Sequence, residues 1–256
     1  MALIEEWGRS GNWLFRWRSF LPIALLFGAV PLVLFGAADV APGSMSWSLI
    51  CLAVALSGQW VRALCVGYTP RGTSGRNTKE GQVAESLNSK GMYGHCRHPL
   101  YLGNFLMWFG IVLYMGNAWF IVVFTLLFWL YYERIMFVEE QFLRGKFGPS
   151  YLEWSDTVPA FLPKLTRWSS PGVPFSLRNV IKREYNGFVA LFVCFAWVDA
   201  LHGFRTAGCD LDSFVSAPFT LTMWPVLGAA ALPLFLILRT IKKRTKWLDV
   251  EGREYV

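Results

Sequence analysis

Long stretches without a charged residue constrain this chain more than any other feature. Uncharged runs cover residues 20–38, 41–61, 99–132 and 213–238, and Asp199 is the one charged residue within 186–204. A helix needs about 20 apolar residues to cross the roughly 30 Å hydrocarbon core of a bilayer. Charged residues make up only 16% of the chain, against about a quarter of an ordinary soluble domain. The sequence therefore predicts an all-α, polytopic integral membrane protein that is embedded in a lipid bilayer.

The run 99–132 is too long for one span and fixes the predicted number of helices. Gly116 and Asn117 lie near its middle and form a turn signal, so the run predicts a tight helical hairpin. The second helix of this hairpin is expected to continue past Tyr132. With the other four runs, the count is about six transmembrane helices.

The basic residues test this count independently. With six spans, 23 of the 24 Lys and Arg residues fall on one side, Arg62 among them, and only Arg205 falls on the other. Because cytoplasmic loops are rich in Lys and Arg, both termini are expected in the cytoplasm. The first run exceeds the roughly 7–15 residues of a signal-peptide core, so we expect it to be retained.

The remaining segments organise the chain into three predicted parts. Residues 1–68 hold two membrane helices, 69–167 a core made of a cytoplasmic loop, the helical hairpin and a tail, and 168–256 an interfacial segment with two more helices. Residues 69–91 are polar and are expected to form a loop with at most one helical turn. Residues 139–154 and 168–183 mix charged and apolar residues, which favours helices lying in the membrane interface.

The cysteines and the net charge exclude other classes. Five cysteines are present, and no two have the spacing of a metal site or suggest a disulfide framework, so no metal is predicted. The net charge of +7 would suggest nucleic acid in a soluble protein. Here its distribution follows the membrane topology, so no nucleic acid partner is expected. The oligomeric state stays open.

The first group of residues that could carry chemistry lies where the loop enters the third span. Two histidines and an arginine stand directly before Pro99, which suits the first turn of a helix. Charged residues at a membrane boundary need polar partners, and helix starts attract anions. The pattern indicates an anion site; the alternative is simple anchoring in lipid headgroups by Arg97 and two interfacial tyrosines, Tyr93 and Tyr101.

The second group lies at the cytoplasmic end of the fourth span. Glu133 and Glu140 share a helix face, and Glu140 could pair with Arg144 four residues on. The hairpin should bring these acids beside the first group, where opposite charges around one pocket would suit a zwitterionic ligand. The alternative is a solvated helix end. Residues 147–154, with Val158-Pro159 and Pro163, predict a helix stop and a fixed tail without chemistry of their own.

Taken together, these motifs resemble a known group of enzymes. The order G-x-Y-x-x-x-R-H-P-x-Y-x-G, E-E-x-x-L-x-x-x-F-G-x-x-Y-x-E and V-P-x-x-x-P, over residues 91–163, is similar to that of isoprenylcysteine carboxyl methyltransferases and phospholipid methyltransferases. The resemblance implies a membrane-embedded methyltransferase that uses S-adenosylmethionine from the cytosol. Its acceptor would be the carboxylate, phosphate or amine of a membrane lipid or lipidated substrate.

The resemblance also implies a set of site residues. Arg97 and Glu140 would be catalytic. The cofactor would be bound by Tyr93, His95, Arg97, His98, Pro99, Tyr101, Gly103, Glu139 and Glu140. The alternative for His98 and Pro99 is a structural role, in which a buried histidine ties the loop to the helix start.

Two departures from the pattern bear on the substrate. Thr157 stands where isoprenylcysteine enzymes tend to carry a basic residue, and two extra spans follow the catalytic part. The chain is more similar to bacterial members, including the lipid A phosphate methyltransferase type, which implies the bacterial inner membrane with the site facing the cytoplasm.

Two other classes stay open at this point. Sterol reductases share R-H-P-x-Y-x-G but use NADPH and carry Asn where Leu100 stands here. A non-catalytic scaffold or transporter is the third possibility, although Asp199 and His202 are few polar residues for a translocation path.

Overall fold

The computed structural model describes residues 2–18, 20–36, 44–70, 76–78, 81–165, 169–216, 223–251 and 253. Within them the fold is helical, as predicted. The helices are α1 Leu3–Trp17, α2 Leu21–Gly28, α3 Val30–Phe35, α4 Met45–Gly67, α5 Pro99–Met115, α6 Ala118–Phe147, α7 Pro149–Thr157, α8 Leu177–Thr206, α9 Leu211–Ser216 and α10 Met223–Arg244, with a 3₁₀ turn η1 at Gly91–Gly94. The short strands β1 Arg76–Thr78 and β2 Gly81–Val83 pair as an antiparallel hairpin.

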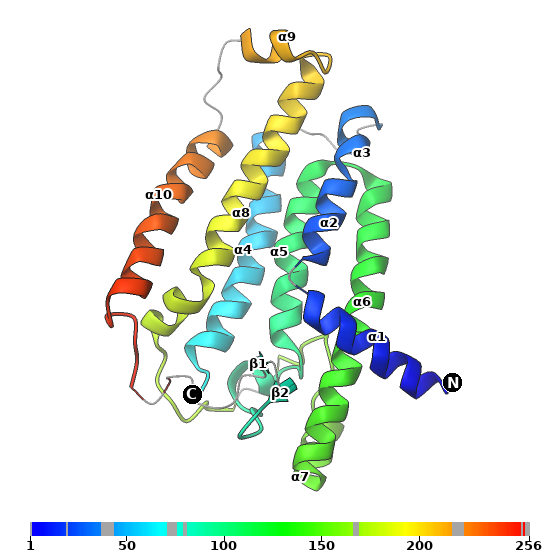
Figure 1. The fold of residues 1–256 in the computed structure, drawn as a ribbon, viewed down its shortest axis with the longest axis vertical. Coiled ribbons are helices and arrows are strands. Elements are labelled where there is room, and N and C mark those ends of the chain that lie inside the picture. The colour runs from blue at the N-terminus through cyan, green and yellow to red at the C-terminus, as the bar shows by residue number, and fades with distance from the viewer. Residues whose placement is uncertain are drawn as a thin grey trace.

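The long helices form an upright bundle (Figure 1). In the described part of the chain, α4, α6, α8 and α10 are long and apolar enough to cross a membrane, and the bent pair of α1 with α2–α3 adds a fifth candidate. Helix α5 is apolar but has 17 residues. The chain is therefore a polytopic membrane protein, and the length criterion supports four or five of the six predicted spans.

The predicted hairpin of α5 and α6 is present. Gly116 ends α5 in the left-handed region at φ +76°, which glycine adopts without strain. The Asn117 side chain then accepts a hydrogen bond of 2.8 Å from the Phe120 amide and caps α6. This turn places the start of α5 and the end of α6 at the same end of the bundle.

Glycines bring α4 and α5 into close contact. A Cβ atom added to Gly58 would lie 2.4 Å from the Gly103 carbonyl oxygen, and one added to Gly103 would lie 2.5 Å from Cγ of Arg62. Small residues of this kind allow backbones to approach in membrane bundles. The contact fixes α5, and with it the loop before α5, against the rest of the bundle.

Several predicted boundaries were wrong. Arg62 lies within α4, because the helix continues to Gly67, and its charge is paired inside the bundle. The last span begins at Met223 rather than at residue 213, since residues 211–216 form the separate helix α9. Residues 217–222 lie outside the described part. In the polar segment 69–91 the structure has the β1–β2 hairpin, and η1 begins only at its end.

The segments predicted to be interfacial belong in part to longer helices. Residues 139–147 continue α6 and residues 149–157 form α7, while the basic residues up to Arg183 lie inside α8. The helix that crosses the bundle obliquely is α1, which packs on α6 (Figure 1). Gly11 of α1 permits this contact, because a Cβ atom there would lie 2.4 Å from the Arg134 carbonyl oxygen.

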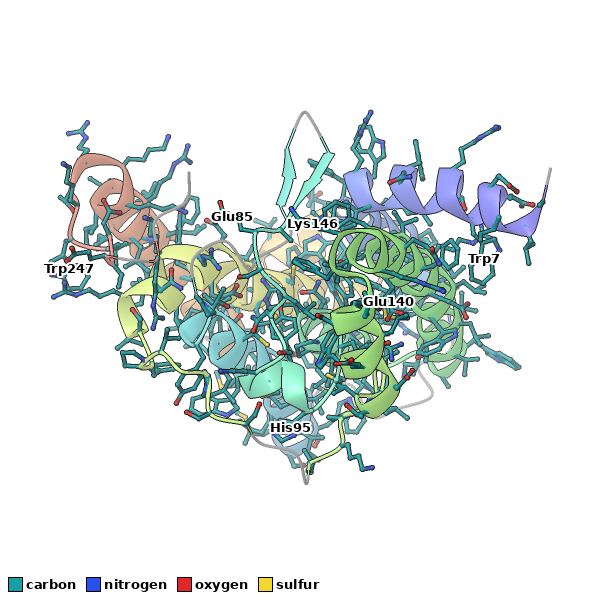
Figure 2. All side chains as sticks on the ribbon, turned by 90° about the horizontal axis from the view of Figure 1, so that it is seen from below. Trp7, Glu85, His95, Glu140, Lys146 and Trp247 are labelled. Carbon is teal, nitrogen blue, oxygen red and sulfur yellow. The ribbon has the colours of Figure 1, made fainter. Side chains whose placement is uncertain are left out.

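The two ends of the bundle differ. The α5–α6 turn, α3 and α9 lie at one end, and η1, the β hairpin and α7 lie at the other (Figure 1). Figure 2 looks at this second end and shows His95 and Glu140 on neighbouring elements within it. The sequence motifs therefore meet at the end where most of the basic residues gather.

Candidate active site

The loop before α5 is held by the tail that follows α7. The Arg97 amide donates to the Pro159 carbonyl at 2.8 Å, and the His98 amide donates to the Ala160 carbonyl at 3.0 Å. Further along, the Lys164 amide donates to the carbonyl of His95 at 2.9 Å. These bonds satisfy the buried backbone of a loop that has no regular structure. The proline-rich tail therefore sets the position of the histidine and arginine side chains.

Arg97 connects three elements. Its Nε donates to Glu140 Oε1 at 2.8 Å and its Nη2 to Glu140 Oε2 at 3.2 Å, in the bidentate geometry of a strong ion pair. Its Nη1 donates to the carbonyls of Ser155 and Val158 at 2.8 and 2.9 Å. These carbonyls lie at the end of α7, where helical partners run out. Four donor contacts of the guanidinium are thus made within the protein.

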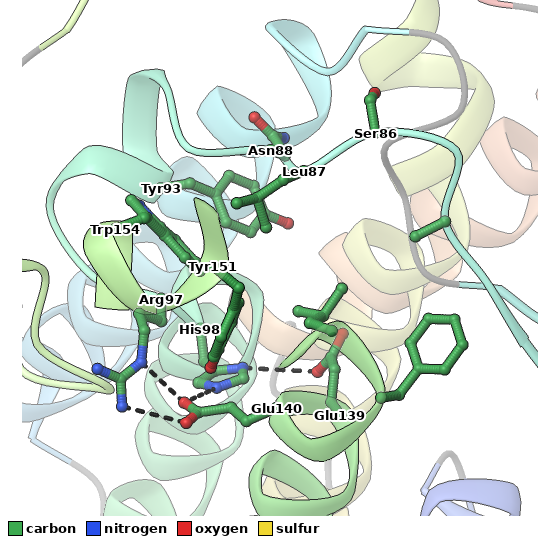
Figure 3. Close-up of a pocket in the computed structure, with 13 residues that line it drawn as sticks. Ser86, Leu87, Asn88, Tyr93, Arg97, His98, Glu139, Glu140, Tyr151 and Trp154 are labelled. Carbon is green, nitrogen blue, oxygen red and sulfur yellow. Dashed lines mark hydrogen bonds and ion pairs between the residues drawn. The ribbon is translucent and has the colours of Figure 1, made fainter. Parts of the chain in front are cut away.

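His98 lies between the two acids (Figure 3). Its Nε2 is 2.8 Å from Glu140 Oε1, and its Nδ1 is 3.5 Å from Glu139 Oε2. Burial alone would lower the pKa of His98, but hydrogen bonds to Glu139 and Glu140 outweigh burial and raise its pKa. The imidazolium form is therefore the one that this site stabilises.

The two acids differ in how many of their carboxylate oxygens bind other side chains of the protein. Both carboxylate oxygens of Glu140 accept hydrogen bonds from Arg97, and one of them also contacts His98. The prediction that Glu140 pairs with Arg144 was therefore wrong. Glu139 uses only Oε2, which accepts from the Tyr101 hydroxyl at 2.8 Å. Among the described residues, Oε1 of Glu139 is left available to the pocket.

A pocket opens beside these acids, between α6, α7 and the segment before η1 (Figure 3). It encloses about 550 Å³, including the open space at its mouth. Its lining consists of Ala84, Ser86, Leu87, Asn88, Tyr93, Arg97, His98, Glu139, Glu140, Phe142, Leu143, Tyr151 and Trp154. The lining therefore combines charged side chains with a set of aromatic rings.

The structure brings together five of the nine predicted site residues and separates four from the pocket. Tyr93, Arg97, His98, Glu139 and Glu140 line it, as listed above. His95 is buried with its Nδ1 2.9 Å from the Lys164 carbonyl, and Pro99 starts α5. Tyr101 stacks on His98 from behind, and Gly103 faces Arg62 and Gly58 of α4. These four residues shape the site without lining it.

The aromatic wall formed by α7 was not predicted from the sequence. Tyr151 and Trp154 are three residues apart and so share a helix face, and their rings meet edge to face at 5.7 Å. Burial and the nearby Glu140 carboxylate raise the pKa of Tyr151. The indole Nε1 of Trp154 is buried and has no hydrogen-bond partner within the described residues. The three-residue spacing of these aromatic residues was the one signal in the sequence that could have indicated the wall. Residues 84–88, which also supply part of the pocket lining, carried no such signal.

Part of this chain is similar to a family of known proteins. The phospholipid methyltransferase family matches residues 43–150, from just before α4 to the start of α7. A protein-S-isoprenylcysteine O-methyltransferase of Schizosaccharomyces pombe is 32% identical over 77 residues, which cover 30% of this chain and 33% of that protein. One from Xenopus laevis is 31% identical over 122 residues, 46% of this chain and 42% of that protein.

A bacterial protein with a different name is also similar. The cobalt-zinc-cadmium resistance protein CzcN of Cupriavidus metallidurans is 34% identical over 86 residues, 34% of this chain and 39% of that protein. The matched region thus spans well under half the length of each of these three relatives. No solved structure matches the chain significantly.

Proposed function

We propose that this chain, whose residues 43–150 match the phospholipid methyltransferase family, is an integral membrane methyltransferase. It takes the methyl group from S-adenosylmethionine and passes it to a membrane lipid or lipidated substrate. The observation that carries the proposal is the pocket of Figure 3, which Glu139 lines together with a set of aromatic residues.

The chemistry of the pocket fits this cofactor. S-adenosylmethionine carries a positively charged sulfonium and ammonium, a carboxylate and an adenine ring. Carboxylates and aromatic faces attract cations, and the rings of Tyr93 and Tyr151 also offer surfaces on which a base can stack. The buried N–H of Trp154 needs an acceptor.

Each polar residue then has a proposed role. Glu139 accepts hydrogen bonds from the cofactor ammonium or ribose, and the Trp154 indole donates to an acceptor on the cofactor. Arg97, His98 and Glu140 hold one another and the end of α7, so we assign them as positioning residues. This assignment replaces the catalytic roles that the resemblance implied for Arg97 and Glu140.

The bound cofactor supplies a methyl group on a positively charged sulfur. The protein then has to hold donor and acceptor in line, about 3–3.5 Å apart, and keep water out. An acceptor oxygen that is already anionic needs no general base, whereas an ammonium acceptor must first lose a proton. No nucleophilic side chain of the protein is required for either acceptor.

We further propose that the site faces the cytoplasm of a bacterium from its inner membrane. The site lies at the end of the bundle where most of the basic residues gather, which is the cytoplasmic end by the positive-inside rule. Two of the relatives are bacterial resistance proteins. A lipid A phosphate methyltransferase activity is one specific version of this proposal, and it is consistent with these observations.

Thermal unfolding of the purified protein in detergent tests the cofactor. A ligand that binds only the folded state raises the melting temperature. S-adenosylmethionine and its demethylated product should raise it in the parent and in Glu153→Gln, a variant of an exposed residue on α7. NADPH should not. Stabilisation by NADPH alone would contradict the proposal and place the chain with the reductases.

A further inference from the structure

Helix α1 differs from the other long helices in its direction. Its axis makes an angle of 78° with the α2–α3 segment, and it crosses α6 obliquely (Figure 1). The α2–α3 segment is uncharged and runs along the bundle to its opposite end, where a Cβ atom on Gly36 would lie 3.3 Å from the Asn117 side chain. Because α2–α3 has the direction of a membrane span, a helix at nearly a right angle to it lies along the membrane surface.

The level at which α1 crosses α6 is that of a membrane boundary. From Ala118 to Val138, α6 rises about 30 Å, which is the thickness of the hydrocarbon core. Helix α1 contacts α6 at the end of this distance. The ring of Trp7 meets that of Phe137 edge to face at 5.6 Å, and a Cβ atom on Gly11 would lie 2.4 Å from Cγ2 of Val138. Helix α1 therefore lies where α6 leaves the hydrocarbon.

One face of α1 is covered by the bundle, and the next face carries exposed aromatic rings. Gly11 and Phe15 are buried. Trp13, Trp17 and the following Phe20 keep 55%, 44% and 61% of their surface exposed. Their rings form a continuous row, with centroids 6.4 Å apart for the first pair and 5.8 Å for the second. A contiguous exposed row of this kind marks an interaction surface, unlike single scattered apolar residues.

The side of α1 that borders this aromatic row is polar. Arg9 and Arg16 are seven residues apart and share a face, and both are exposed. Arg16 and Trp17 are adjacent, so their side chains point about 100° apart. Tryptophan on one side and arginine on the other is the pattern of helices that lie in the plane of a membrane interface.

We propose that α1 docks on the lipid surface of the leaflet that borders the pocket of Figure 3. The rings of Trp13, Trp17 and Phe20 enter the region between headgroups and acyl chains, and Arg9 and Arg16 lie among the lipid phosphates. The charge of the polar side favours lipid over a second copy of the chain, because arginines are attracted to anionic headgroups and repel the same arginines of a second copy. The inference does not depend on methyl transfer.

The docked helix also sets the depth of the pocket of Figure 3. Helix α1 packs on Phe137 and Val138, and Glu139 and Glu140 of the pocket follow directly in the chain. The rest of α6 and all of α7 continue away from the hydrocarbon (Figure 1). The pocket therefore lies at the level of the lipid headgroups, just outside the hydrocarbon core.

Fluorescence quenching by nitroxide-labelled lipids tests the docking on the full chain. Single cysteines are introduced together with Cys194→Ser and Cys209→Ser, since the other three cysteines are buried. Each is labelled with an environment-sensitive fluorophore in bilayers of phosphatidylcholine and phosphatidylglycerol. The nitroxide is placed either on the acyl chain or on the headgroup. Melting temperatures show which variants fold as the parent does.

Neighbouring residues of α1 supply matched pairs for this measurement. The label at Trp17→Cys should be quenched by the acyl-chain nitroxide about twofold or more above the label at Arg16→Cys, because the apolar face enters about 5–10 Å into the boundary. Trp13→Cys and Asn12→Cys form a second pair of exposed neighbours and give the same test where Trp17→Cys does not fold.

Two positions on α6 calibrate the depth. Leu126 is 60% exposed near the middle of the span, and Gly145 is exposed about 10 Å beyond Val138. The acyl-chain nitroxide should quench the label at Leu126→Cys strongly and the label at Gly145→Cys little. Equal quenching at these two positions would contradict the headgroup level of the pocket.

The pairs on α1 decide the docking itself. Equal acyl-chain quenching at Trp17→Cys and Arg16→Cys would overturn the proposal. A label at Trp17→Cys that neither nitroxide quenches would also overturn it, because a second copy or another protein would then cover the aromatic row. We expect acyl-chain quenching at Trp17→Cys and headgroup quenching at Arg16→Cys.

Discussion

Glu139 and Glu140, two neighbouring acids near the end of α6, have different roles. Glu140 accepts hydrogen bonds from Arg97 and His98, whereas Glu139 keeps one carboxylate oxygen for the pocket. We expect Glu139→Gln to lose cofactor affinity by about 10- to 150-fold, the equivalent of a charge-assisted hydrogen bond of roughly 1.5–3 kcal/mol. Its melting temperature without ligand should also fall, because Glu139 contacts His98 and Tyr101, so cofactor affinity is the measurement that decides its role.

Glu140→Gln should lose more stability than affinity for the cofactor. It removes the negative partner of a partly buried Arg97, so the protein should melt at a lower temperature even without ligand. Titration of both variants with S-adenosylmethionine, followed by calorimetry and by thermal unfolding, checks this difference. Equal cofactor affinity in Glu139→Gln and the parent would show that Glu139 is structural.

His98 gives the stability of this site a defined dependence on pH. Its pKa is raised in the folded protein because hydrogen bonds to Glu139 and Glu140 outweigh burial. A raised histidine pKa stabilises the fold fully below the unfolded value of about 6.5, and this contribution is lost as pH rises through the folded pKa. The melting temperatures of the parent and His98→Gln should therefore differ most at low pH and converge above about 6.5. A difference that grows with pH would contradict this account.

At the scale of the helices, the position of the site depends on how closely α4 and α5 approach. Gly58→Ala would place a Cβ atom 2.4 Å from the Gly103 carbonyl and 2.7 Å from the Met107 amide, both of which are backbone. The helices must move apart, at a cost of about 1–3 kcal/mol. Gly145→Ala on the exposed side of α6 meets nothing within 4 Å and serves as the control.

Thermal unfolding in detergent measures both variants. Gly58→Ala should melt below the parent, and Gly145→Ala should melt at or slightly above the parent, since alanine favours a helix by about 0.5–1 kcal/mol over glycine. Indistinguishable curves for Gly58→Ala and the parent would mean that α4 and α5 are not in close contact.

The elements that sequence reasoning predicted well are those with a local signal. The α5–α6 hairpin followed from Gly116 and Asn117 inside an uncharged run, and it correctly brought the arginine–histidine loop beside the acids. Arg62 was misplaced because a charge was taken to end a span. Its partner Glu184 lies 122 residues away, and only the folded bundle shows that the pair is satisfied.

The aromatic wall of the site was missed for a similar reason, because the three-residue spacing of Tyr151 and Trp154 predicts a shared helix face but not which segments that face meets. Tyr151 and Trp154 stand in a segment with the composition of a simple helix end. They reach the pocket because Gly148, at φ +52°, turns the chain between α6 and α7 and because Arg97 holds the end of α7. Contacts that depend on several distant segments have no local signature.

At the scale of the whole molecule, we expect one orientation in the membrane. Ser150 on α7 and Ser213 on α9 are exposed and lie at opposite ends of the bundle. In a chain with Cys209→Ser, a membrane-impermeant maleimide added to intact cells should label Ser213→Cys and not Ser150→Cys. Cys96 is buried and would be a poor probe. Labelling of Ser150→Cys in intact cells would reverse the proposed orientation and put the site outside the cytoplasm.

Methyl transfer itself tests the central claim most directly. The purified protein is incubated with methyl-labelled S-adenosylmethionine and a membrane lipid extract, and label is then measured in the lipid fraction. We predict label in lipid with the parent and with Glu153→Gln, and a loss of about tenfold or more with Glu139→Gln at limiting cofactor. An absence of label in lipid with the parent, or equal labelling with Glu139→Gln, would contradict the account.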